Sequence, residues 1–389
     1  MQEKDEAFIH MGYVCYNSYL EIDLGIIQEN YRFIRRFIPD GTEIIPVLKQ
    51  NAYGFGAVRT AQVLCREESV KTIALAQVGE AVELREAGVD CELLVLGAFP
   101  LEMIPIAVEN DLTLTVFRPD VVKMVDAEAQ KQGKTVGVHI KIETGLNRTG
   151  VLPGEPLAEL LEALKRAGNT KVRGVFSHFI SGEEPDSPEA KRQLQKFLFA
   201  AEQVHKAGWT DIKRHICNSG AIGWYPEAYL DAVRIGQRLY MDSRELPLSK
   251  IGGGALREAA SWRTTVTNLH TAEPGETVGY NGEFAVTRPT VVATIGVGYG
   301  DGLSMNFGRA GSPVLVNGQR ARYIGMCMDQ CMLDVTDIAC SIGDEVTILG
   351  RASNGAFLSA QELAATVGYD GNIFIDFLSS RVERRYING

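Results

Sequence analysis

Short apolar runs alternate with amphipathic stretches over the first two thirds of the chain. The stretches between the runs, such as 57–68 and 189–207, have the length and spacing of helices. Alternating apolar strands and helices indicate a parallel sheet with helices on its faces. Eight apolar runs have the character of buried strands: 43–49, 72–76, 93–97, 112–116, 138–142, 172–177, 214–218 and 232–236.

Eight strand–helix units in roughly 200 residues predict an α/β fold, a (β/α)8 TIM-like barrel. A doubly wound open sheet is the structural alternative. Such sheets usually have fewer strands and a GxGxxG turn after the first strand, and this chain shows no such turn there. The barrel therefore fits the pattern better.

The pattern changes after about Ala255. Four predicted strands (264–269, 290–297, 313–316 and 345–349) are separated by turn signals, and helical stretches are few, with 359–367 the clearest. We therefore predict a barrel domain over 17–255 and a mostly β domain over 256–389. One further strand, 19–23, falls outside the eight, and we expect it to pair with the β domain.

Composition excludes several classes of protein. The 389 residues fit two domains, and 45% hydrophobic with 23% charged residues is typical of a globular protein. A net charge of −10 argues against a nucleic-acid surface. Seven cysteines without a CxxC pair, and six histidines without paired spacing, favour reduced thiols and no metal. No run is long enough to span a bilayer, so we expect a cytoplasmic protein, although a membrane segment could precede Met1 in a longer parent.

The first apolar run ends at Lys49, immediately before a turn that contains Gly54 and Gly56. Burial at the edge of a core favours a neutral amine, which can attack a carbonyl and form a Schiff base. Tyr53, between the lysine and the glycines, can reach a phosphate that lies close to the backbone. Strand, lysine and phosphate loop together suggest pyridoxal phosphate. An ordinary strand-end lysine before a turn is the alternative.

Barrel enzymes carry their sites at the C-terminal ends of the strands. Besides Lys49, these ends carry Arg148 after the fifth strand, His178 after the sixth, Asn218-Ser219 after the seventh and 234–236 at the eighth. Taken singly, each could be a surface arginine, a core histidine or a helix cap. Together they place a nucleophilic lysine, a carboxylate-binding arginine, an imidazole and phosphate-binding turns on one rim.

At eight places the chain resembles the alanine racemase family. The motifs occur in order and with matching spacing over nearly the whole chain, which is far more specific than any one of them. The family comprises fold-type III pyridoxal-phosphate enzymes with an N-terminal barrel, a C-terminal β domain and a head-to-tail homodimer, so the resemblance implies all of these. The motifs are KQNAYGFG (49–56), KIETGLNRTG (141–150), VFSHF (175–179), Asn218-Ser219, 234–236, TVGY (277–280), GYGDG (298–302) and CMDQ (327–330).

The resemblance implies two proton-transfer bases, Lys49 and Tyr280, with Tyr280 supplied by the partner subunit. Racemisation needs a base on each face of the α-carbon, because a single base tends to return its proton to the same face. Lys49 would also hold the cofactor, and His178 would contact Tyr280. Arg234 would point at the pyridine nitrogen, and because a guanidinium keeps its proton, the ring would be a weaker electron sink.

The same resemblance implies the binding residues. The substrate carboxylate would bind Arg148 and the N–H of Met328 of the partner subunit, and Tyr299 of the partner subunit would line the entrance. Lys141 matches a position that is often a carbamylated lysine, since a carbamate would accept hydrogen bonds from Arg148 where a second cation would repel it. An ordinary cationic lysine is the alternative. The implied cofactor contacts, besides Lys49 and Arg234, are Tyr53, His178, Asn218, Ser219, Gly236 and Gln237.

The chain departs from the family pattern at three places. Phe55 replaces a usual histidine, and Gln237-Arg238 replaces small or apolar residues, which leaves the charge of Arg238 in need of a partner. Aligning 381–384 with the family's RVPR puts Asn372 where a tyrosine usually lies near the substrate. Asparagine is smaller and offers a donor and an acceptor for a substrate hydroxyl. A shift of a few residues in this alignment is the alternative.

We therefore predict a pyridoxal-phosphate-dependent racemase of alanine, serine or both. The departure at Asn372 favours serine, as in the serine racemase domains of membrane-bound vancomycin-resistance racemases, or a broad-specificity racemase. A pyridoxal-phosphate decarboxylase is one alternative class, but such enzymes usually place an acidic residue where this chain has Arg234. A non-catalytic cofactor-binding protein is another, and it would not need the second base that Tyr280 supplies.

Overall fold

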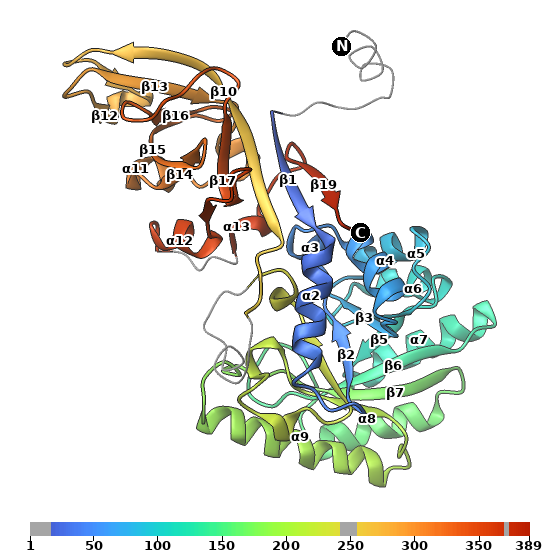
Figure 1. The fold of residues 1–389 in the computed structure, drawn as a ribbon. Coiled ribbons are helices and arrows are strands. Elements are labelled where there is room, and N and C mark those ends of the chain that lie inside the picture. The colour runs from blue at the N-terminus through green and yellow to red at the C-terminus, as the bar shows by residue number, and fades with distance from the viewer. Residues whose placement is uncertain (1–16, 242–254, 369–372) are drawn as a thin grey trace. The chain divides into compact units, whose positions relative to one another are not determined.

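The computed structural model describes residues 17–241, 255–368 and 373–389. Their contacts divide the chain into two compact units (Figure 1). One unit comprises residues 24–257, and the other combines strand β1 (Ser18–Asp23) with residues 258–389. In the described part of the chain, no helix is both long and apolar enough to cross a membrane.

A parallel barrel forms the unit at 24–257. Strands β3 to β8 are hydrogen-bonded in order, and β2 pairs with β9. Backbone hydrogen bonds close the ring, from Leu48 N–H to the Ala74 oxygen (2.9 Å) and from Arg234 N–H to the Cys217 oxygen (3.0 Å). The predicted (β/α)8 barrel is confirmed, and each strand overlaps one predicted run. The strands are β2 (Glu43–Pro46), β3 (Thr72–Leu75), β4 (Glu92–Val95), β5 (Thr113–Val116), β6 (Val136–Lys141), β7 (Thr170–Phe176), β8 (Lys213–His215) and β9 (Ala232–Ile235).

Helices cover the outside of the barrel, and side chains fill its inside. Strands β3, β5, β6 and β9 are consequently buried along their whole length, which explains why their sequences are almost continuously apolar. The helices of this unit are α2 (Leu24–Arg35), α4 (Ala57–Glu67), α5 (Val78–Glu86), α6 (Ile104–Glu109), α7 (Pro119–Gln132), α8 (Glu155–Arg166) and α9 (Pro188–Lys206), with short 3-10 turns at 101–103, 219–221, 226–228 and 237–239.

The chain between β2 and α4 makes a left-handed turn, α3 (Lys49–Tyr53). Residues 50–53 have φ angles of 52° to 56°. This conformation costs about 1–2 kcal/mol for each residue that has a Cβ atom, and the Gly54 N–H closes the turn on the Gln50 oxygen (3.0 Å). The turn brings the first and last side chains together, so that the Lys49 ammonium lies 5.6 Å from the centre of the Tyr53 ring.

An antiparallel sheet forms the second unit. Strands β17, β14, β15, β16, β13 and β10 pair in this order, and the pairing of β17 with β10 closes them into a ring that leaves few exposed edges. Strand β1 adds to β10, and β19 adds to β1 in parallel. The elements are β10 (Ala260–Ala272), β11 (Thr277–Val278), β12 (Phe284–Ala285), β13 (Thr290–Ile295), α11 (Met305–Ala310), β14 (Pro313–Val316), β15 (Gln319–Met326), β16 (Cys331–Asp334), β17 (Glu345–Arg351), β18 (Phe357–Leu358), α12 (Ala360–Ala365), α13 (Ile373–Asp376) and β19 (Glu383–Ile387), with 3-10 turns at 280–282 and 299–301.

The predicted strands of this unit correspond to β10, β13, β14 and β17, and the expected pairing of 19–23 with the β domain is confirmed by the register of β1 on β10. The predicted barrel range 17–255 counted this strand with the barrel, whereas its hydrogen bonds hold it in the second unit. Asn317 and Gly318 have φ angles of 49° and 74°, which fit the tight hairpin turn between β14 and β15. The sequence prediction missed β15, β16 and β19.

Candidate active site

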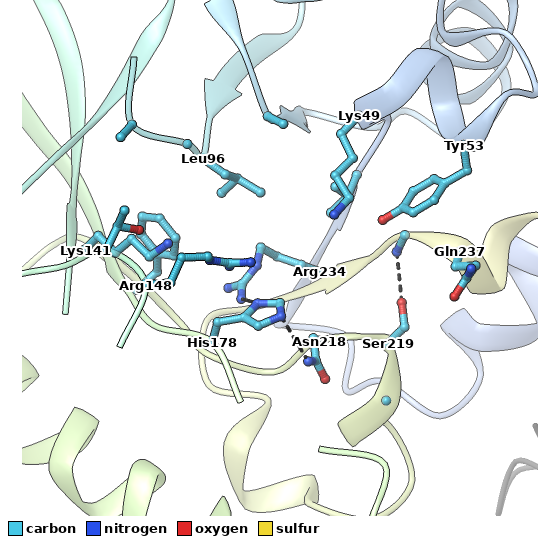
Figure 2. A pocket seen from close by; sticks show the side chains of 18 residues that line it. Lys49, Tyr53, Leu96, Lys141, Arg148, His178, Asn218, Ser219, Arg234 and Gln237 are labelled. Atoms are coloured by element: carbon cyan, nitrogen blue, oxygen red, sulfur yellow. Dashed lines mark hydrogen bonds between the residues drawn. The ribbon is translucent and has the colours of Figure 1, made fainter. Parts of the chain in front are cut away.

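A cavity of about 470 Å³ lies at the C-terminal ends of the barrel strands (Figure 2). Its described lining includes four cationic side chains and no carboxylate, although the chain has a net charge of −10. Such a lining suits an anionic ligand, for example one with a phosphate or a carboxylate. Ten of the predicted site residues line it: Lys49, Tyr53, Lys141, Arg148, His178, Asn218, Ser219, Arg234, Gly236 and Gln237.

One end of the cavity carries the hydroxyl groups of Tyr53 and Ser219 beside the backbone of Gly236, which has no side chain. The Tyr53 hydroxyl lies so close to Gly236 that a Cβ atom at this position would overlap it. Glycine is therefore needed for the approach. The Gly236 N–H donates to Ser219 Oγ (2.9 Å), which fixes the second hydroxyl beside the first. Because hydroxyls can donate to phosphate oxygens, this end fits the phosphate of the predicted cofactor.

Arg234 lies on β9 and is buried against the C-terminal ends of β7 and β8. Its guanidinium donates to the carbonyl oxygens of Ser177 (2.7 Å), His215 (3.1 Å) and Ile216 (3.3 Å). It also donates to the Nδ1 atoms of His215 (2.8 Å) and His178 (3.1 Å). Burial lowers the pKa of Arg234 to about 10, so the group stays cationic at neutral pH.

His178 is neutral and presents a donor to the cavity. Because a guanidinium can only donate, Nδ1 of His178 accepts from Arg234, and the ring proton resides on Nε2. Loss of solvent, followed by the charges of Arg234 and Arg148, holds the pKa of His178 well below its usual value. Asn218 Nδ2, 3.4 Å from Nε2, is also a donor, so the Nε2–H group can bind an acceptor placed in the cavity.

Lys141 and Arg234 lie near the same aromatic ring. The Lys141 Nζ atom is 5.4 Å and the Arg234 Cζ atom 5.5 Å from the centre of the Phe176 ring. Burial, with the nearby charges of Arg148 and Arg234, lowers the pKa of Lys141 to about 8. Roughly a tenth of this lysine is therefore uncharged at pH 7.

Two predicted substrate residues lie together in the β unit. The Tyr299 N–H donates to the Cys327 oxygen (3.1 Å) and the Gly300 N–H to the Met328 oxygen (2.7 Å), which ties both segments into one turn cluster. Met328 and Tyr280 have exposed side chains (57% and 69%). The remaining predicted substrate contact, Asn372, lies outside the described residues.

The structure shows how two of the sequence departures are accommodated. Phe55 is buried and stacks on Tyr240, with ring centres 4.6 Å apart. Arg238, for which the sequence indicated no partner, donates to the carbonyl oxygen of Ser219. It therefore helps to fix the loop that carries the Ser219 hydroxyl.

The sequence prediction missed other lining residues. Leu96 and Ala76 reach the cavity from the ends of β4 and β3, and the rule that sites lie at strand ends, applied to all eight strands, would have found them. Phe176, which also lines the cavity, and His215, which accepts from Arg234 behind it, lie within predicted strands. No local pattern distinguishes them from core residues.

The barrel, the lysine at the end of its first strand and the anion-binding end of the cavity define a pyridoxal-phosphate enzyme built on a barrel. Two family models match the chain, "Alanine racemase, N-terminal domain" over residues 22–244 and "Alanine racemase, C-terminal domain" over residues 259–386. An alanine racemase of Desulforamulus reducens is 36% identical over 371 residues, which cover 94% of this chain and 98% of that protein.

Solved structures of alanine racemases are also similar to this chain. The alanine racemase of Clostridium difficile 630 superposes with a TM-score of 0.89 at 28% identity, covering 96% of this chain and 97% of that chain. The alanine racemase of Bacillus anthracis with bound L-Ala-P gives a TM-score of 0.89 at 30% identity, covering 97% and 96%. The chain belongs to the alanine racemase family, and it is a pyridoxal-phosphate-dependent racemase. The predicted fold class, enzyme class and cofactor are thereby confirmed.

Acidification should destabilise the protein through its buried histidines. Burial lowers the pKa of His139 to about 4 and holds those of His178 and His215 well below the usual value. Below the unfolded pKa of about 6.5, the unfolded chain binds protons that the folded chain excludes. The free energy of unfolding should therefore be independent of these groups above pH 6.5 and fall below it, by up to about 1.4 kcal/mol per pH unit for each histidine.

Urea unfolding between about pH 8 and about pH 5 measures this slope. His139→Asn should reduce it by about one proton, whereas the exposed His205→Asn should leave it unchanged. Equal slopes for the parent and His139→Asn would show that His139 does not resist protonation. The charged groups nearest His139 are Glu92, Lys213, Arg173 and Arg234, and they are the same in all three proteins.

Proposed function

We propose that this racemase interconverts the enantiomers of alanine and of serine, with two bases contributed by two subunits of a homodimer. Lys49 would act on one face of the substrate α-carbon and Tyr280 of the partner subunit on the other. The described lining of the cavity, with four cationic side chains and no carboxylate, supports this proposal. Arg234 would point at the pyridine nitrogen, where a decarboxylase would usually place an acidic residue.

The residues of the cavity fit pyridoxal phosphate. Tyr53, Ser219 and the backbone at Gly236 would hold the phosphate, with Asn218 and Gln237 beside it. Lys49 supplies an amine that can bond to the cofactor's aldehyde carbon. When bound, the cofactor supplies an electron sink for the bonds at the substrate α-carbon. The protein's part is to orient the substrate and to move the α-proton.

His178 would support Tyr280 of the partner subunit. Its Nε2–H group is a neutral donor, because Arg234 occupies Nδ1 and the ring pKa is held well below its usual value. A donor aimed at a phenol oxygen stabilises the phenolate, which is the form that can accept the α-proton. Met328 and Tyr299 of the partner subunit would complete the substrate side.

Tyr280→Phe tests the second base. Because it removes the acid–base group and little volume, kcat should fall by about 100-fold or more while the cofactor stays bound. In deuterated water, the variant should exchange the α-hydrogen of one enantiomer without racemising it, since Lys49 still acts on its own face. Tyr386→Phe, on β19, is the matched control and should behave as the parent. Parent-like racemisation by Tyr280→Phe would rule out a role for the phenol.

Lys141 would carry a carbamate that orients Arg148 towards the substrate carboxylate. Carbamate formation joins a neutral amine to carbon dioxide and releases one proton. The Lys141 pKa of about 8 makes the neutral amine accessible near neutral pH. Conversion of a cation to an anion would also relieve repulsion among Lys141, Arg148 and Arg234. A carbamate would accept the N–H groups of Arg148 as an ammonium could not.

A ¹³C spectrum of the protein kept in ¹³C-bicarbonate measures this modification. The parent should show one carbamate signal that Lys141→Arg abolishes, because arginine keeps the positive charge and has no amine to react. The same variant should raise KM for alanine, since Arg148 would lose its acceptor. A parent spectrum without a carbamate signal would leave Lys141 as an ordinary lysine.

Asn372 would extend the substrate range to serine. An asparagine in place of a tyrosine makes room for the larger side chain and offers a partner for its hydroxyl. A polar group in a pocket favours a hydroxylated substrate only where it would otherwise lack a partner. An asparagine that solvent reaches would meet this condition only in part, so both amino acids should react.

Racemisation of L-serine and L-alanine by the parent and by Asn372→Tyr tests this specificity. The variant should lose activity on serine and keep activity on alanine. If the parent accepts alanine alone and the variant matches it, Asn372 is not the residue that contacts the substrate. Asn388→Tyr, a surface change in the same tail, controls for general damage to this segment.

A further inference from the structure

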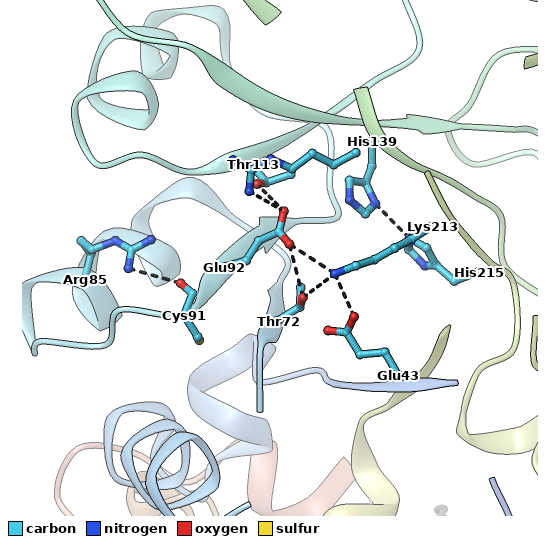
Figure 3. A network of polar contacts seen from close by, with 10 residues as sticks. Glu43, Thr72, Arg85, Cys91, Glu92, Thr113, His139, Lys213 and His215 are labelled. Carbon is cyan, nitrogen blue, oxygen red and sulfur yellow. Dashed lines mark hydrogen bonds and ion pairs between the residues drawn. The ribbon is translucent and has the colours of Figure 1, made fainter. Parts of the chain in front are cut away.

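A line of buried hydrogen bonds leads from Arg234 through His215 to His139. Figure 3 shows the contact between the two histidines. Arg234 Nη1 lies 2.8 Å from His215 Nδ1, and His215 Nε2 lies 2.9 Å from His139 Nδ1. Both histidine side chains are fully buried, and the arginine is 2% exposed. The three residues come from the adjacent strands β9 and β8 and from β6, two strands away from β8.

The direction of these bonds is fixed by the arginine. A guanidinium has donors and no acceptor, so His215 Nδ1 must carry a lone pair, and the proton of its neutral ring must be on Nε2. That proton points at His139 Nδ1, which must therefore be the acceptor. The proton of the neutral His139 ring is then on Nε2. Each ring thus has one permitted tautomer.

The barrel is shaped to hold the two rings in this position. His215 stacks on Phe176, with centres 5.0 Å apart and planes 3° from parallel. A Cβ atom at Gly174 would come within 2.5 Å of His139 Cε1 and 2.6 Å of its Nδ1, so glycine leaves the space that the His139 ring occupies. These features fix the rings independently of any charge.

In the described part of the chain, no hydrogen-bond acceptor meets the far side of the His139 ring. Among the described residues, its Nε2 atom is buried without a hydrogen-bond partner. The nearby Glu92 carboxylate is already bound by Thr113 (2.8 Å), Arg173 (3.1 Å) and Lys213 (3.4 Å), as Figure 3 shows in part. A buried donor without a partner destabilises the folded protein. The unsatisfied donor of this line is the N–H of His139, whereas His215 and Arg234 keep their partners.

We propose that His139 is a positioning residue for the proposed racemase reaction. Its Nδ1 lone pair holds His215 in the tautomer that accepts from Arg234, and it thereby keeps the guanidinium in place at the floor of the cavity. Without this lone pair, the buried His215 N–H has no acceptor. In the other tautomer, the His215 N–H points at the N–H of Arg234. The first state leaves a buried donor unsatisfied, and the second costs Arg234 its shorter contact with a histidine ring.

Two substitutions separate the effect of the His139 Nδ1 lone pair from the effect of the side-chain volume. Asparagine places its Oδ1 near the position of Nδ1, so His139→Asn should keep the acceptor. His139→Leu fills similar space without an acceptor. Relative to the parent, His139→Leu should lower kcat for alanine by about tenfold with little change in KM, because a buried donor loses its partner. His139→Asn should stay within about threefold of the parent.

A second readout does not depend on turnover. Long-range ¹H–¹⁵N spectra of the ¹⁵N-histidine holoenzyme report which ring nitrogen carries each proton, and only six histidines contribute. The parent and His139→Asn should show His215 protonated on Nε2 alone. In His139→Leu, the His215 signals should shift towards the other tautomer or towards a mixture.

Thr42→Val is the matched control, since it deletes a comparable hydrogen bond of the same barrel, from Thr42 Oγ1 to the Leu230 oxygen (2.9 Å). Thr42 directly precedes β2, at the end of the strand opposite to the cavity. It should leave kcat and the His215 tautomer unchanged. The proposal is overturned if His139→Leu keeps the parent tautomer and kcat, or if His139→Asn and His139→Leu lose kcat equally. If the parent itself fails to racemise alanine, the proposed function fails, whereas the tautomer spectra still decide the role of His139.

Discussion

Arg234 can donate hydrogen bonds but cannot accept them, and it is buried inside the barrel. Each of its N–H groups must therefore meet an acceptor that the protein provides. The carbonyl oxygens of Ser177 and Ile216 and the unprotonated ring nitrogens of His178 and His215 meet this need. All of these are neutral dipoles. They stabilise the positive charge of Arg234 without neutralising it, so this charge can still attract an anionic ligand in the cavity.

The other cations of the cavity depend on this uncancelled charge. Lys141, Arg148 and Arg234 raise one another's electrostatic cost, and the lowered Lys141 pKa is one consequence. A bound phosphate or carboxylate would relieve the same repulsion, so ligand binding and folding should reinforce each other. The β unit contributes to this picture through Tyr299 and Met328, which its backbone hydrogen bonds tie into one turn cluster. Rigid elements thus present the polar groups on both units.

The sequence predicted the barrel because its strands are buried on both faces and read as apolar runs, and it predicted most of the cavity because sites lie at strand ends. It missed β15, where Arg320 and Arg322 interrupt the apolar pattern of a strand with one face in solvent. The contact between His139 and His215 spans 76 positions, and nothing local to either residue indicates it. The handedness of the turn after Lys49 was also beyond prediction, because residues 50–53 include no glycine. Contacts between residues far apart in the sequence, and strained backbone conformations, depend on the whole fold and therefore leave no local sequence pattern.

The left-handed turn ties the chemistry to the length of a segment. Lys49 and Tyr53 face one another because four peptide units separate them within one turn. Removing or adding a single residue would rotate Tyr53 by roughly 100° around the turn and carry its hydroxyl away from Gly236. Substitutions in 50–52 alter contacts one at a time, whereas a change of length would displace both functional groups together. The length of this loop therefore constrains the positions of the two functional groups more strongly than the residue types at 50–52 do.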